Sequence, residues 1–343
     1  MLLRQLLFTA LCATTLFGCD SQNSDDSDPF PQEECTPPGP SGCWIEKTAT
    51  PSKRQELQPA KLGTKIYVVG GMNGTSFQDM EVLSSVEVYD TVTDSWTAVA
   101  SIPNARHHIA TASTGGKIYA SGGMTGQFSS EWKERDYLHE YDPDTNVWTE
   151  LASMPTARGE HLAVAFGGKI YFIGGRFDLG RDSNANEVYD PATDSWDTRA
   201  SMPTARRSFA VAVLDSLIYV IGGRHLDGPS LSDLATVEAY SPASDTWYSR
   251  AELPFPRGAL ALGVLHDKLY AMGGEYFTGQ GGVYEHNQQY DPVADHWSDV
   301  ESMPRPAHGT GAVTINDTIY VAGGGVQVAV FSSGFMQAFT IDP

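Results

Sequence analysis

The chain has 343 residues, of which 41% are apolar, and its formal net charge at pH 7 is −20. This profile is typical of a globular protein with a large core and excludes a disordered chain or a membrane bundle. With 22 basic against 42 acidic residues, the chain lacks the basic footprint that displaces counterions from phosphate, so we expect no binding to nucleic acid.

Residues 1–18 are predicted to be an export signal. Arg4 supplies the positive charge, and the apolar run that follows it is too short to span a bilayer comfortably. Residues 16–19 read Leu-Phe-Gly-Cys, which resembles the lipobox of bacterial lipoproteins, with Phe17 where a small residue is usual. The resemblance implies lipidation of Cys19 and a protein held on a bacterial membrane, periplasmic or at the cell surface, by its lipid anchor alone. The alternative is a cleaved secretory signal with an incidental Cys19.

Residues 19–43 are expected to form an acidic, proline-rich tether. They contain six carboxylates and no Lys or Arg, so the segment buries little and repels itself. Cys35 and Cys43 remain as a pair after Cys12 and Cys19 are accounted for. In an oxidising compartment this pair predicts a disulfide across a short loop.

From Trp44 onward the chain is periodic, and residues 44–343 are predicted to be one repeat domain. Trp, Pro, a Gly pair and an aromatic residue recur six times, with Pro seven residues after Trp and the Gly pair 19 residues after Pro. Only the interval from the Gly pair to the aromatic residue varies, from 15 to 19 residues. Three constant spacings and one variable spacing indicate a fixed scaffold with one adjustable loop in each unit.

Each conserved spacing has a structural reason. Runs such as 65–69 and 169–173 are β-branched and aromatic, as expected for strands buried between sheets. The Gly pair ends such a strand where backbones crowd and a positive φ is required. Tyr-Asp-Pro-x-Thr-Asp-x-Trp, at Tyr189 to Trp196, predicts a hairpin that places the Tyr and Trp on adjacent strands. A unit of about 50 residues cannot bury both faces alone, so the units must pack around an axis.

These motifs resemble the kelch repeat over most of the chain. The resemblance implies an all-β, six-bladed propeller with four-stranded blades. The strand at Trp44 has no preceding partner strands of its own, and the last unit ends after its third strand, near Ile341. We therefore expect the N-terminal strand to complete the sixth blade, which removes exposed sheet edges. An open or seven-bladed ring is the alternative.

An arginine recurs three residues after the Pro, at Arg54, Arg106, Arg158, Arg206 and Arg257, with Ala307 in the sixth unit. Five arginines around an axis suggest an anion trap. Because they recur with the scaffold residues, we favour a structural role in which they bind loop carbonyls between blades.

Polar residues that differ from unit to unit follow these arginines and the Gly pairs. We predict that they surround a mixed polar site on the face where the loops meet, suited to a sugar or a polar peptide side chain; ordinary solvated loop residues are the alternative. The candidate binding residues are His107, His108, Glu160, His161, Arg176, Arg207, Arg224, His225, Glu275, Tyr276 and His308.

No cofactor or metal site is predicted. His107 and His108 are adjacent, so on a strand they would face opposite sides and could not easily chelate one ion. The Glu-x-x-x-Asp-x-x-x-His iron motif of plant specifier proteins has Arg135 at its middle position here. No nucleophile elbow or phosphate-binding glycine loop is evident.

The leading functional hypothesis is a monomeric, non-catalytic module that binds a glycan or a protein partner through its loop face. A second hypothesis is an enzyme resembling bacterial sialic acid mutarotases, in which Glu275 acts as general acid and base; the Arg expected shortly after it is missing, and Arg176 or Arg224 would have to replace it. A third is a structural component of an envelope complex.

Overall fold

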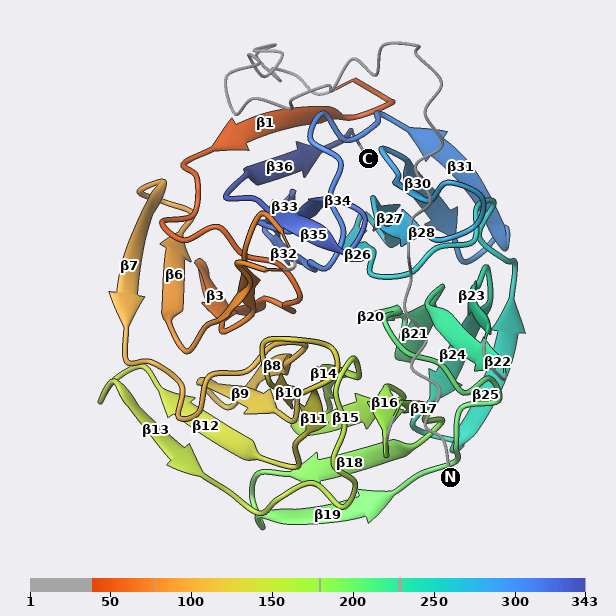
Figure 1. Cartoon of the computed structure of the whole chain (residues 1–343). Coiled ribbons are helices and arrows are strands. Elements are labelled where there is room, and N and C mark those ends of the chain that lie inside the picture. Colours follow the sequence, from red (N-terminus) through yellow and green to blue (C-terminus); the bar gives the residue numbers. More distant parts are fainter. Residues whose placement is uncertain (1–38, 77, 179, 228–229, 343) are drawn as a thin grey trace, which may run out of the picture. The chain divides into compact units, whose positions relative to one another are not determined.

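The computed structural model describes residues 39–76, 78–178, 180–227 and 230–342. These residues form strands, turns and loops and include no helix, and thus none that could cross a membrane. Six four-stranded antiparallel sheets follow one another around a central axis (Figure 1). The expected six-bladed propeller is confirmed.

In each blade the first strand lies nearest the axis and the fourth lies outermost (Figure 1). Blade 1 comprises β2 (Ala60–Leu62), β3 (Lys65–Val69), β6 (Val86–Asp90) and β7 (Ser95–Val99). Blade 2 comprises β8 (Ala110–Thr114), β9 (Lys117–Ser121), β12 (Leu138–Asp142) and β13 (Val147–Glu150). Blade 3 comprises β14 (Leu162–Phe166), β15 (Lys169–Ile173), β18 (Asn186–Asp190) and β19 (Ser195–Thr198). Blade 4 comprises β20 (Ala210–Leu214), β21 (Leu217–Ile221), β24 (Val237–Ser241) and β25 (Thr246–Arg250). Blade 5 comprises β26 (Ala261–Leu265), β27 (Lys268–Met272), β30 (Asn287–Asp291) and β31 (His296–Val300). Blade 6 comprises β32 (Ala312–Ile315), β33 (Thr318–Ala322), β36 (Met336–Thr340) and β1 (Cys43–Lys47).

The variable interval of each blade contains a short second hairpin, which the sequence analysis did not predict. These hairpins stand beyond the Gly pairs, on the same end of the ring as the loops that connect one blade to the next. They are β4 (Met72–Asn73) with β5 (Glu81–Val82), β10 (Met124–Thr125) with β11 (Lys133–Glu134), β16 (Arg176–Phe177) with β17 (Arg181–Asp182), β22 (Arg224–Asp227) with β23 (Ser230–Asp233), β28 (Glu275–Tyr276) with β29 (Gly282–Val283), and β34 (Gly325–Gln327) with β35 (Val330–Ser332).

The ring is closed as predicted, by the strand at Trp44. β1 pairs antiparallel with β36, with Trp44 opposite Phe339 and Lys47 opposite Met336. The two strands lie side by side in Figure 1, although almost the whole chain separates them in sequence. β1 covers the edge of β36, which would otherwise be exposed.

Each repeated Trp binds its blade to the preceding one. Trp148 Nε1 donates a hydrogen bond to the carbonyl of Ala100 at 2.8 Å, and equivalent bonds occur in all six blades. Across the ring closure, Trp44 Nε1 donates to the carbonyl of Glu301 at 2.9 Å. The closing junction therefore repeats the bond of the internal ones.

The hairpin Asp adds a second link at most of these junctions. Asp194 has φ 47° in its turn. Its Oδ1 accepts from the hydroxyl of Tyr189 in its own blade at 2.7 Å and from the backbone N–H of Ala152 in the preceding blade at 2.9 Å. Burial raises the pKa of Tyr189, and the hydrogen bond to Asp194 raises it further. One carboxylate thus fixes both a turn and a blade boundary.

Cys43, at the start of β1, is disulfide-bonded. Its predicted partner Cys35, the lipidation site Cys19 and the signal segment 1–18 lie outside the described residues. The Cys35–Cys43 pairing and the boundaries of the signal and tether therefore stay predictions.

Candidate functional site

The loops that meet at one end of the ring are held by backbone pairing. In every blade the residue that follows the recurring arginine position pairs with the residue after the Gly pair, as Arg207 does with Arg224. The next blade's loop crosses directly over the Gly pair: Gly123 N–H donates to the Arg158 carbonyl at 2.9 Å. A Cβ on Gly122 would lie 2.4 Å from that same carbonyl oxygen, so only glycine fits.

One residue further on, the chain adopts the left-handed conformation in every blade. These six residues form a ring around the axis, which we call the axial ring: Glu56, His108, Glu160, Ser208, Ala259 and Gly309, with φ between 50° and 60°. Four of the six neighbouring pairs are joined by backbone hydrogen bonds, including His108 N–H to the Glu56 carbonyl at 2.9 Å and Ser208 N–H to the Glu160 carbonyl at 3.1 Å. A left-handed residue other than glycine costs on the order of 1 kcal/mol, and five of the six residues of the axial ring are not glycine.

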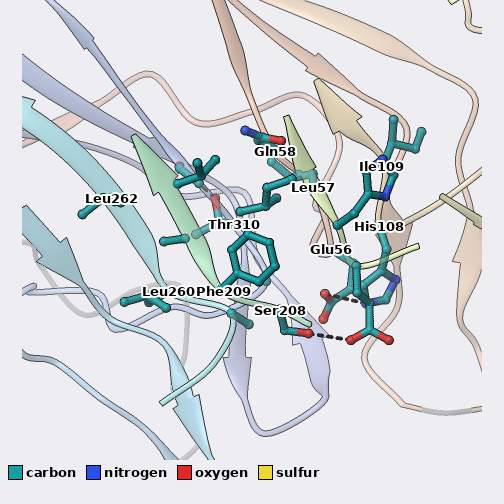
Figure 2. A pocket seen from close by; sticks show the side chains of 18 of the residues that line it. Glu56, Leu57, Gln58, His108, Ile109, Ser208, Phe209, Leu260, Leu262 and Thr310 are labelled. Carbon is teal, nitrogen blue, oxygen red and sulfur yellow. Dashed lines mark hydrogen bonds and ion pairs between the residues drawn. The ribbon is translucent and has the colours of Figure 1, made fainter. Parts of the chain in front are cut away.

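The axial ring separates two cavities. A cavity of about 70 Å³ lies on the axis inside the ring of blades, with mainly apolar walls. Figure 2 shows this axial cavity, with Glu56, His108 and Ser208 gathered at one end and Leu262 near the other. A larger cavity of about 390 Å³, the loop-face cavity, opens among the hairpins. Glu56, His108, Glu160 and Ser208 line both cavities, so their side chains are the partition between them.

The partition carries charge. Glu56 Oε2 lies 2.8 Å from His108 Nε2. Burial alone would raise the pKa of Glu56, but the facing His108, and then His308 and Arg224, lower it to about 2. Burial would lower the pKa of His108, yet Glu56 and then Glu160 hold it above its ordinary value. The two shifts in pKa favour an imidazolium–carboxylate pair.

Glu160 is the second buried carboxylate of the partition. Its Oε2 accepts a hydrogen bond from Ser208 Oγ at 2.5 Å. Burial favours protonation, but His108, Arg207, Ser208 and Arg176 together lower the pKa of Glu160. It is ionised in the folded protein.

Three arginines from blades 3 and 4 line the loop-face cavity, and each is held by an acidic residue of a hairpin strand. Arg176 Nε lies 2.8 Å from Glu134, Arg207 Nε 2.5 Å from Asp182, and Arg224 Nε 3.1 Å from Asp233. Arg224 also reaches Glu275, whose Oε1 is 3.1 Å from its Nη2.

The rim of the loop-face cavity is apolar. Phe128, Leu231 and Phe277, on three different blades, line it with 43%, 40% and 38% of their surfaces exposed. Trp132 lines it further in, with the Arg176 guanidinium 5.5 Å from its ring centroid. A charged floor beneath an apolar, aromatic rim suits a ligand that is apolar at one end and polar at the other.

The structure brings six of the predicted binding residues together around the loop-face cavity: His108, Glu160, Arg176, Arg207, Arg224 and Glu275. His308 is buried behind them, with Nδ1 3.4 Å from Glu275. The other four do not line this cavity. His107 packs against Trp132, and His161 lines the axial cavity and contacts Ser121.

The remaining two lie toward the outside. The His225 side chain is 41% exposed and contacts Asp182 at 3.1 Å, and the Tyr276 ring stacks on Tyr284 with centroids 4.4 Å apart.

The expectation that His107 and His108 face opposite sides is wrong. His108 has φ 52°, so the backbone is not extended, and the two Nδ1 atoms come within hydrogen-bonding distance. Burial, and then the neighbouring His108, lower the pKa of His107 well below its ordinary value. Even so, the described part of the chain contains no group of three His, Cys, Asp or Glu residues that could hold a metal ion.

The five recurring arginines are structural, as favoured, and all are fully buried. Arg158 donates to the Gly174 carbonyl at 2.8 Å and to the Glu187 carboxylate. The carbonyl belongs to the blade that the arginine's loop leads into, so each arginine anchors its loop to the next sheet. None is available as an anion trap.

Sequence reasoning missed Glu56, Trp132 and the acidic partners of the cavity arginines. Glu56 occupies the same repeat position as His108 and Glu160, five residues after the Pro, so an alignment of the six units identifies it. The sequence has seven Trp residues, and Trp132 is the one that does not belong to the repeat. The acidic partners Glu134, Asp182 and Asp233 had no such signal, because they lie in intervals of variable length.

These features define a closed six-bladed β-propeller with a cavity on its loop face. The family model of the KLHDC2/KLHL20/DRC7 Kelch-repeats domain matches residues 41–175 and 154–325. The chain belongs to the kelch-repeat family.

The chain is also similar to individual kelch proteins. It is 28% identical to Kelch-like protein terF of Aspergillus terreus over 76% of this chain and 46% of that protein, and 29% identical to Kelch-like protein 36 of Rattus norvegicus over 67% of this chain and 29% of that protein. It thus spans less than half the length of these relatives. A solved structure, of YjhT, superposes with a TM-score of 0.72 at 17% identity, over 84% of this chain and 95% of that one, and shares the fold.

Proposed function

We propose that this propeller is a binding module that takes part of a protein partner into its loop-face cavity. The observation that supports this is the contrast between the repeating scaffold and the cavity, which is lined by residues that differ from blade to blade. The apolar rim supports a macromolecular partner, because Phe128, Leu231 and Phe277 expose apolar surface where the cavity opens.

Site-specific photo-cross-linking tests this proposal. A benzophenone amino acid in place of Phe277 should form cross-links to one partner in the source cells. The matched control is Val293, which is 93% exposed in the turn between β30 and β31, at the opposite end of its blade. Cross-links at both positions or at neither would contradict a binding site on the loop face, and a cross-link to a glycan would replace the protein partner.

The proposal extends to location: an exported protein held by a lipid on Cys19 at the periplasmic or outer surface of a bacterial membrane. The support is the sequence of residues 1–19. Growth with an alkyne-tagged fatty acid should label the wild-type chain and leave Cys19→Ser unlabelled. Equal labelling of the two would place any lipid elsewhere.

A second candidate function, a mutarotase-like enzyme, is supported by two contacts of Glu275. Arg224 lies beside Glu275, where the sequence lacked the expected Arg, and His308 lies 3.4 Å from the same carboxylate. Glu275 would transfer the proton between ring oxygen and anomeric hydroxyl. Anomerisation of sialic and uronic acids followed by NMR tests this: turnover that Glu275→Gln abolishes would replace the binding-only proposal.

A further inference from the structure

The arginines of the loop-face cavity are already matched by acidic residues. Arg176, Arg207 and Arg224 each contact a buried or nearly buried carboxylate through Nε. These partners, Glu134, Asp182 and Asp233, lie behind the arginines and neutralise the three guanidinium charges. An acidic ligand would have to compete with carboxylates fixed by the fold.

Glu160 occupies the position that an anionic ligand would take. Its Oε1 lies 3.9 Å from Nη1 of both Arg176 and Arg207, so it stands between the two groups. Its side chain is 9% exposed, and its backbone has φ 55°, a conformation that favours glycine. A left-handed residue is thus used to place a carboxylate where two arginines converge.

Carboxylates outnumber guanidinium groups around the cavity. Besides the three outer acids, the carboxylates of Glu56, Glu160 and Glu275 line the cavity wall. Six carboxylates face three guanidinium groups, and the other basic groups beside them are the imidazoles of His108 at Glu56, His225 at Asp182 and His308 at Glu275. In a partly buried cavity such charge is screened weakly, so it acts strongly on a ligand.

Aromatic rings complete a site for a cation. Trp132, Phe128 and Phe277 line the same cavity as the carboxylates. The Arg224 guanidinium lies 4.4 Å from the centroid of Phe277, so one face of that ring already carries a cation.

We infer that the loop-face cavity binds the basic side chain, Lys or Arg, of a partner's peptide segment, and that Glu160 is an internal anion that excludes acidic groups from the arginines. The inference rests on the proposed function and specifies its partner chemistry. Apolar residues beside the basic one would contact the rim, and the −20 charge of the chain would attract such a partner.

The test compares two peptides on the full chain. One carries a Lys and the other a Glu between the same aromatic neighbours, with both ends blocked, and binding is followed by NMR shifts and calorimetry. We expect the wild type to bind the Lys peptide at least about tenfold more tightly than the Glu peptide. Equal binding, or tighter binding of the Glu peptide, would overturn the inference, and this comparison requires no variant.

Glu160→Gln should reverse the preference, because the two arginines are then open to the Glu peptide. Glu160→Gly should do the same while removing the left-handed strain, and it covers the case in which the Gln variant folds poorly. The control is Asp317→Asn, which changes the net charge equally at a side chain 89% exposed in the turn between β32 and β33. An equal effect of Asp317→Asn would assign the preference to overall charge and overturn the inference.

The outcomes separate the two proposals. If neither peptide binds while Phe277 still cross-links to a partner, the inference fails and the proposed function stands. If Phe277 forms no cross-link and neither peptide binds, both fail.

Discussion

At the scale of single residues, the clearest rule of this propeller is the partner of each buried arginine. The third strand of each of blades 1 to 5 carries that partner two residues before its aromatic anchor: Glu87, His139, Glu187, Glu238 and Gln288. Arg158 and Arg206 bind Glu187 and Glu238, whereas Arg106 meets His139 at 3.3 Å. Nη1 of Arg106 is buried without a partner among the described residues.

Replacing His139 by Glu should stabilise the protein. The guanidinium of Arg106 is already buried, so a carboxylate there compensates its charge as Glu187 does for Arg158, and we expect a gain of about 1–3 kcal/mol. Chemical denaturation measures it. The reverse exchange, Glu187→His, should cost a similar amount, and a gain from it would contradict the rule.

The same substitution should change the response to acid. Burial, and then Arg106, lower the pKa of His139 to about 4, so the imidazole is neutral in the folded chain and becomes protonated on unfolding below about pH 6.5. The contribution of the neutral His139 imidazole to the stability of the folded state is complete above pH 6.5 and is lost as the pH falls to about 4. Melting temperatures across this range should fall less steeply in His139→Glu than in the wild type.

His108 in the axial ring should make stability depend on pH in the opposite direction. The pKa of His108 is raised, so the stabilisation by its pair with Glu56 is complete below about 6.5 and is lost as the pH rises through the folded pKa. His108→Asn keeps a residue that tolerates positive φ, and at about pH 5.5 we expect it to cost about 1–3 kcal/mol. The difference from the wild type should shrink in alkaline buffer, and a constant difference would argue against the ion pair.

At the scale of elements, the fold depends on junctions between blades that are chemically alike. Trp44 and Trp196 make the same Nε1–carbonyl bond, one at the ring closure and one at an internal junction. Trp→Phe keeps the ring and removes the donor. Each variant should cost about 0.5–1.5 kcal/mol in denaturant unfolding, because each loses one hydrogen bond.

The comparison of the two variants tests the closure. A clearly larger cost for Trp44→Phe would show that the closing junction carries more of the stability than an internal one. Removal of β1 itself should be far more damaging, because it exposes the edge of β36 along its whole length.

The strands of the blades were predictable because each is fixed by a local pattern: an apolar run, a Gly pair or a turn such as Asp190 to Trp196. The second hairpins were not, because their lengths differ and no spacing repeats. The left-handed ring residues were also missed. His108 and Glu160 do not have glycine's freedom, and their conformation follows from the neighbouring loops to which they are hydrogen-bonded.

At the scale of the whole molecule, net charge should influence how fast the proposed basic partner associates. A chain of net charge −20 with an acidic cavity should attract a basic peptide over distance. Raising the ionic strength from about 10 to about 200 mM should slow association of the Lys peptide roughly tenfold and change its dissociation much less. Stopped-flow fluorescence measures both rates, and an unchanged association rate would contradict electrostatic attraction.

The sequence by itself determined the number of blades, the closing strand, and the end of the ring at which variable residues collect. These properties depend on spacings repeated six times, and a repeated spacing has one structural solution. Only the tertiary structure decided which variable residues share a cavity and what charge that cavity has. Glu160, Arg176 and Arg207 come from different loops, and the pairing of the arginines with hairpin carboxylates depends on how those loops pack. Six candidate residues thus line one cavity, and the three arginines among them are paired with hairpin carboxylates.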